Sequence, residues 1–180
     1  MKIRTGFVSN SSSSSFVVAL PHKPKDVKDL QEMLFGKEQW HYNSIAYDGD
    51  DKDVPTIDIA EKVFKKIKRK ATKKEIFESI ADGWFDVFFM LPGHYNIDQN
   101  DPDYERIDND DPNRMEKLRK QWAKESKENK KRAKDISEAF QRMNKEKYIV
   151  VMSFSDNDGE AMEEHTDIFR RVEKIRTSYH

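Results

Sequence analysis

Short, wholly apolar runs in the chain predict buried strands. Residues 16–20 form such a run and are closed by Pro21, a pattern typical of a short buried strand. Residues 148–154 form a longer run, apolar and rich in β-branched side chains, which favours a central strand. A last strand is expected over residues 172–180. These three segments supply the strands of a small sheet.

Apolar positions at helical spacing predict several helices between the strands. Thr72 and Glu75 have the spacing of a capping box, which marks the start of a helix. Pro24 and Gly36 likewise bracket an amphipathic segment. We expect helices over residues 25–35, 56–70, 73–82 and 160–171, a buried helix or strand over 84–91, and an irregular loop over 37–55 with an edge strand near 44–47.

The segment from residue 112 to about 147 contains no helix breaker after Pro112 and predicts one long, charged helix. Its apolar seam is interrupted at Ser126 and Asn129, beside Lys130, Lys131 and Arg132. The middle of this apolar face therefore cannot be well buried against the rest of the protein. Two alternatives follow: a continuous helix that crosses solvent, or a helical hairpin.

Together these elements predict an α+β fold. We expect a single domain over residues 1–180, with the sheet covered by helices. An acidic loop over residues 94–113 and the long basic helix or hairpin over 112–147 would form an appendage.

Composition narrows the class of protein. The 180 residues include 37% charged residues and no cysteine, which excludes a disulfide framework and a thiolate metal site. No apolar run approaches the roughly 20 residues that a membrane span needs. The chain also lacks the charged and apolar regions of a secretory signal. We therefore expect a cytoplasmic protein without a membrane partner.

Charge is strongly segregated although the formal net charge is only −1. Residues 98–111 hold seven acidic residues against one arginine. Residues 61–74 hold eight lysines and arginines against one glutamate, and residues 114–147 hold 13 against six acids. Such blocks favour contact with a charged macromolecule. Within the long helix, the expected contact residues are Lys130, Lys131 and Arg132.

A run of five serines precedes the first strand. Consecutive hydroxyl and N–H groups in a loop can surround an anion, so the run is a candidate ligand-binding loop. The serines could instead accept a modification, or form a flexible linker. The candidate ligand-binding residues are Ser11, Ser12, Ser13, Ser14 and Ser15.

The N-terminal string Gly-Phe-Val-Ser-Asn-Ser-Ser-Ser-Ser-Ser-Phe, residues 6–16, resembles a signature of uncharacterised proteins from tailed bacteriophages and bacteria. The C-terminal end is similar to the end of the same group at Phe154, Ser155, Asp156, Gly159, Glu163 or Glu164, His165, Phe169, Ile175, Ser178 and His180. The resemblance covers about 40 of the 180 residues, at the two ends. It implies a phage or bacterial source and no particular activity.

Pairing of the first strand with strand 148–154 would bring both chain ends together. The serine run would then lie near Asp156, Asp158, His165 and His180, which are candidate acid/base residues. Asp156 and Asp158 are also candidate ligands of a divalent metal. Alternatively, residues 155–159 form an ordinary turn in which an aspartate caps the next helix. The remaining histidines, His22, His41 and His94, are expected on the surface.

The charge pattern and the absence of a complete catalytic motif favour a phage-type accessory protein that binds a host or viral macromolecule. Two alternatives stay open. One is a small metal- or acid/base-dependent enzyme acting on a phosphorylated or nucleotide substrate. The other is nucleic-acid binding through the basic helix.

Overall fold

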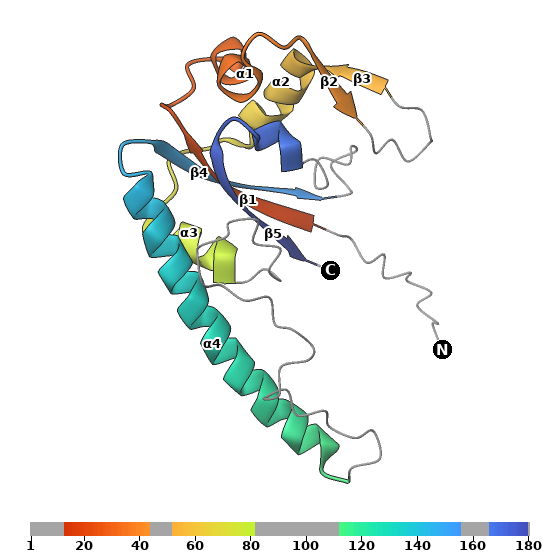
Figure 1. The fold of residues 1–180 in the computed structure, drawn as a ribbon, viewed down its shortest axis with the longest axis vertical. Helices are drawn as coiled ribbons and strands as arrows, with labels where there is room; N and C mark the ends of the chain where they lie inside the picture. The colour runs from red at the N-terminus through yellow and green to blue at the C-terminus, as the bar shows by residue number, and fades with distance from the viewer. Residues whose placement is uncertain (1–12, 44–51, 82–111, 156–165, 180) are drawn as a thin grey trace, which may run out of the picture.

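The computed structural model describes residues 13–43, 52–81, 112–155 and 166–179, which form an α+β fold as predicted (Figure 1). In chain order its elements are β1 (Ser13–Leu20), α1 (Val27–Phe35), β2 (Trp40–Asn43), β3 (Lys52–Pro55), α2 (Thr56–Lys66), α3 (Lys73–Ala81), α4 (Arg114–Met143), β4 (Tyr148–Ser155), the 3₁₀ helix η2 (Thr166–Phe169) and β5 (Glu173–Tyr179).

The two strands predicted from apolar runs and the expected last strand form one antiparallel sheet in the order β4-β1-β5. Phe16 of β1 pairs with Met152 on one side and with Arg176 on the other. The expectation that β4 is central is wrong, because within the described chain it lies at an edge and β1 is central. β4 is apolar nonetheless because Ile149, Val150, Met152 and Phe154 are buried against helices on both faces.

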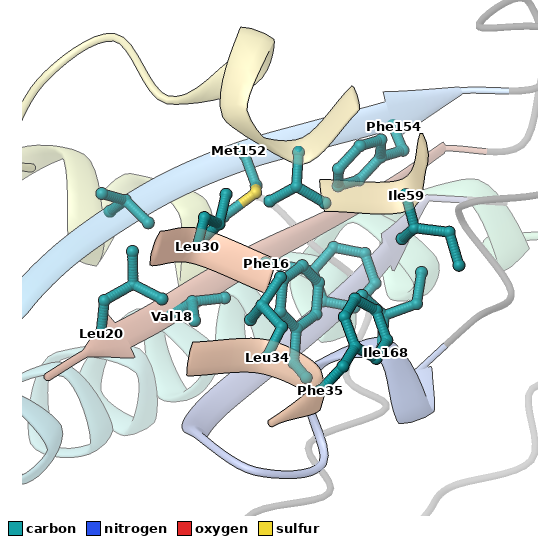
Figure 2. Close-up of a cluster of buried hydrophobic side chains, with 13 residues drawn as sticks. Phe16, Val18, Leu20, Leu30, Leu34, Phe35, Ile59, Met152, Phe154 and Ile168 are labelled. Atoms are coloured by element: carbon teal, nitrogen blue, oxygen red, sulfur yellow. The ribbon is translucent and has the colours of Figure 1, made fainter. Parts of the chain in front are cut away.

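One face of the sheet is covered by α1, α2 and η2 (Figure 1). Phe16 lies at the centre of this layer, and its ring centroid is 5.8 Å from that of Phe154 and 5.1 Å from that of Phe169. Figure 2 shows side chains of β1 and β4 meeting Leu30, Leu34 and Phe35 of α1 and Ile59 of α2. This layer is the larger of the two hydrophobic clusters.

The opposite face is covered by α3 and the C-terminal part of α4. Val17 and Ala19 of β1 point to this side, because successive strand residues face opposite ways. Ile80 of α3 and Phe140 of α4 pack against them. The central strand is therefore buried on both faces.

A second, two-stranded sheet is formed by β2 and β3. The prediction of an irregular loop over residues 37–55 is therefore wrong at its two ends, and the strand expected near 44–47 falls outside the described residues. His41 of β2 was expected on the surface, yet its side chain is buried and its ring centroid lies 5.6 Å from that of Phe35. His22, in contrast, is half exposed and pairs with Asp29 at 3.1 Å.

The capping box predicted for α3 is confirmed. The Thr72 N–H donates to Glu75 Oε2 at 2.8 Å, and the Glu75 N–H donates to Thr72 Oγ1 at 3.2 Å. Arg69 Nη2 donates to Glu75 Oε1 at 2.6 Å. The hydrogen bonds from Thr72, with the charge of Arg69 beside them, lower the pKa of Glu75.

We expect the contribution of the capping box to the free energy of unfolding to depend on pH. Thr72→Ala should lower the free energy of unfolding by about 1 kcal/mol at pH 7, the usual cost of a lost N-cap. Because the folded-state pKa of Glu75 is lowered, its contribution is complete above the ordinary glutamate pKa of about 4.3 and is lost as the pH falls through the folded-state value. Urea titrations of Glu75→Gln should therefore differ from wild type at pH 7 and converge on it in acid.

The matched control for this prediction is Glu32→Gln, an exposed glutamate of α1. It should leave stability within about 0.5 kcal/mol of wild type at every pH, as surface substitutions usually do. A Glu75→Gln deficit that persisted unchanged into acid would contradict the assignment.

The long helix α4 is one continuous helix of 30 residues, about 45 Å long, so the hairpin alternative is wrong. Ala133, Ile136 and Phe140 are buried against the sheet and α3, whereas Met115 near the start is 56% exposed. The N-terminal half projects beyond the sheet (Figure 1). Among the helices of the described ranges, none is both long and apolar enough for a membrane crossing.

The prediction of a helix over residues 160–171 is wrong for residues 166–171, the part that the structure describes. Residues 166–169 form the single 3₁₀ turn η2, and β5 begins at Glu173. Ile168 and Phe169 are buried in the larger cluster. The segments 84–91 and 94–111 lie outside the described residues.

Candidate functional site: a basic cleft between α3 and α4

The serine run is partly strand rather than loop. Ser13, Ser14 and Ser15 belong to β1 and pair with β4 and β5 on either side, which corrects the expectation of a loop up to residue 15. A backbone paired on both sides has its N–H groups committed to the sheet. Ser11 and Ser12 lie outside the described residues.

The hydroxyls of Ser14 and Ser15 are engaged within the sheet. Both residues are buried, and Ser15 Oγ lies 2.6 Å from Ser153 Oγ. Ser14 Oγ accepts from Arg176 Nη2 at 3.1 Å. These contacts give Ser14 and Ser15 a structural role, and a role in ligand binding remains a prediction.

The two chain ends converge as expected. Ser13 pairs with Ser155 at the end of β4 and with Tyr179 at the end of β5. The candidate acid/base and metal residues Asp156, Asp158, His165 and His180 all lie outside the described residues. The described part of the chain contains no cluster of three or more potential metal-ligating side chains. The proposed metal- or acid/base-dependent chemistry therefore stays a prediction.

A cleft of about 840 Å³ lies between α3 and α4 on the second face of the sheet. α3 and the linker before it form one wall, and the C-terminal part of α4 with the turn into β4 forms the other. Among the described residues, its cationic lining residues are Lys70, Lys73, Lys74, Lys134, Arg142, Lys145 and Lys147, and Glu138 is the single carboxylate.

The floor of the cleft is apolar and its walls are held in place by hydrogen bonds. Ile76 and Phe77 of α3 and Ile149 of β4 contribute the floor. The Ala71 N–H donates to the Ile149 carbonyl at 2.8 Å, which joins the α2–α3 linker to the edge of the sheet. On the other wall, the buried Asn144 donates from Nδ2 to the Phe140 carbonyl at 3.0 Å and ends α4.

Most of the cationic groups around the cleft have no neutralising carboxylate among the described residues. Lys134 lies 3.9 Å from Glu138, and Lys74 lies 3.5 Å from Glu78. Within the described ranges no ion pair involves the other five cations, which are Lys70, Lys73, Arg142, Lys145 and Lys147. The cleft therefore presents an excess of positive charge above an apolar floor, which suits an anionic ligand with an apolar part.

The predicted contact residues of the long helix extend this site. Lys130 and Lys131 are exposed and lie four and three residues before Lys134, so they continue the same helix face along the projecting half. Arg132 is half-buried and lies next to the buried Ala133. The cleft thus joins the ends of two basic blocks that are far apart in the sequence.

Sequence reasoning identified both basic blocks and missed the cleft between them. The signal was present in the excess of lysine over residues 61–74 and 114–147. The packing of Ile76 and Ile80 against Ile136 and Phe140 decides that the ends of the two blocks face one another.

Comparison with protein-family models, with curated proteins and with solved structures gave no match to this chain.

Proposed function

We propose that this protein binds an acidic segment of a partner protein in the cleft between α3 and α4. The observation that carries the proposal is the lining of seven cationic side chains and one carboxylate around an apolar floor. A peptide that alternates carboxylates with aliphatic side chains matches both properties. The resemblance of the serine signature to phage proteins supports a host or viral protein as the partner, met in the host cytoplasm.

A protein partner fits the cleft better than a nucleic acid does. The whole chain has a formal net charge of −1 and a pI near 6.5, well below the basic balance typical of nucleic-acid binders. Six of the seven cations are lysines, whereas bidentate recognition of phosphates and base edges favours arginine. Of the residues that the structure describes, only one aromatic side chain, Phe77, lines the cleft, so these residues offer no platform for stacking successive bases.

The proposal is tested by fluorescence anisotropy with a labelled peptide that alternates glutamate and leucine. Lys73→Glu combined with Lys145→Glu reverses one charge on each wall and should weaken binding about tenfold or more, because like charges at an interface are costly. Binding should also weaken with added salt, since the walls are exposed. Circular dichroism and a urea titration show that the variant remains folded.

Lys28→Glu is the matched control, because Lys28 is exposed on α1, on the opposite face of the sheet. It reverses one charge, half the change made by the double variant, and should alter peptide affinity by less than about twofold, as a distant rim charge does at moderate salt. Equal weakening by Lys28→Glu would show non-specific charge attraction. Tighter binding of a duplex oligonucleotide than of the peptide, also lost on Lys73→Glu/Lys145→Glu, would replace the proposal with nucleic-acid binding.

A further inference from the structure

Lys147 stands between two hollows of the surface. It lines the α3–α4 cleft and also a smaller hollow of about 290 Å³ at the end of the sheet where β1 stops and β4 and β5 start. The smaller hollow is lined by Ala19, Pro21, Lys147, Arg170, Arg171, Val172 and Glu173. The two hollows therefore share one cationic side chain.

The two arginines of the smaller hollow are held differently. Arg170 forms an ion pair with Glu38, so its charge is neutralised. Arg171 lies against Gly36, the residue that ends α1: a Cβ atom on Gly36 would be only 3.0 Å from the guanidinium carbon of Arg171. Gly36 also has φ +64°, a conformation in which a larger residue would be strained.

Arg171 is exposed, and its guanidinium lies close to the Gly36 backbone. Arg171 forms no ion pair with another described residue. A guanidinium without an ion-pair partner can bind a carboxylate with two parallel hydrogen bonds. Lys147 adds a second positive charge to the hollow, which also contains the carboxylate of Glu173.

We propose that the Arg171–Lys147 hollow is a second carboxylate-binding subsite for the same acidic partner segment. The inference rests on the proposed function of the α3–α4 cleft. The partner chain would lie across Lys147, with one group of acidic residues in the cleft and another on Arg171. Linking two weak subsites through one chain raises the overall affinity because the second contact becomes intramolecular.

Labelled oligoglutamates of two lengths test this arrangement. About six extended residues span roughly 20 Å and about 20 residues span roughly 66 Å. We expect the short peptide to occupy the cleft, which has the greater number of cations, and the long peptide to contact Arg171 as well. Arg171→Gln should weaken the long peptide about five- to tenfold and change the short one by less than about twofold. Arg171→Ala should do the same, and Arg171→Lys should restore part of the affinity.

Each result decides between the two proposals. If Lys73→Glu/Lys145→Glu weakens both peptides while Arg171→Gln weakens neither, the second subsite is overturned and the cleft stands. Equal weakening of both lengths by Arg171→Gln also overturns a subsite reached only by a long chain. If Lys73→Glu/Lys145→Glu has no effect on either peptide, the proposed function itself fails. Lys28→Glu serves as the charge control, and thermal melts exclude unfolding of the Arg171 variants.

Discussion

Phe16→Ala is expected to lower the free energy of unfolding by about 3–5 kcal/mol. Phe16 is fully buried on the central strand, and its ring contacts those of Phe154 and Phe169. Removing it takes apolar area from the core and leaves a cavity that strands paired on both sides of β1 cannot close. Domains of this size are stable by about 5–15 kcal/mol in total, so the loss is a large fraction.

Urea unfolding followed by circular dichroism measures this effect as a shift of the midpoint at an unchanged slope. Trp40→Ala is the control, because Trp40 is 59% exposed on β2 and its truncation should cost less than about 0.5 kcal/mol. A cost below about 1 kcal/mol for Phe16→Ala would show that the layer formed by α1, α2 and η2 does not pack on β1 as described.

Phe140→Ala should also cost about 3–5 kcal/mol, for a reason that concerns the cleft directly. Phe140 is buried where α4 meets α3 and the sheet, in the same cluster as Ile76, Ile80 and Ile136. Its carbonyl accepts the hydrogen bond of Asn144 that ends the helix. Loosening this contact separates the two walls of the cleft, so peptide binding should weaken together with stability.

The control for Phe140→Ala lies on the same helix. Met115 is 56% exposed on the projecting half of α4, and Met115→Ala should change stability by less than about 0.5 kcal/mol. Hydrogen exchange should agree, with slower exchange of the amides near Phe140 than of those near Met115. Comparable costs for the two substitutions would contradict a helix that is docked at one end and projects at the other.

Local patterns predicted most of the elements correctly. The apolar runs located β1 and β4, and the Thr72–Glu75 spacing located the start of α3. These signals are local. A capping box involves residues three positions apart, and a run of apolar side chains within one short segment is enough to indicate a buried strand. The pairing of β1 with β4 was expected because both are core-type strands, and the structure shows that this pairing is antiparallel.

The wrong predictions concern a strand position and a side-chain burial that depend on segments distant in the sequence. β4 was expected to be central because it is apolar on both faces, yet it is an edge strand whose faces are covered by helices. His41 was assigned to the surface, but the β2–β3 pairing and Phe35 bury it. A residue's own chemistry does not reveal which distant segment will cover it.

The sequence by itself determined the α+β class, the segregation of charge into blocks and the poorly buried middle of the long helical segment. Each of these depends on composition or on the periodicity of one segment, and helix periodicity acts within a few residues. Only the tertiary structure decided that the lysines near residue 73 face those near residue 145, and that Lys147 joins this cleft to Arg171. That arrangement follows from packing Ile80 and Phe140 onto the sheet, a long-range contact between surfaces that carries no local signature.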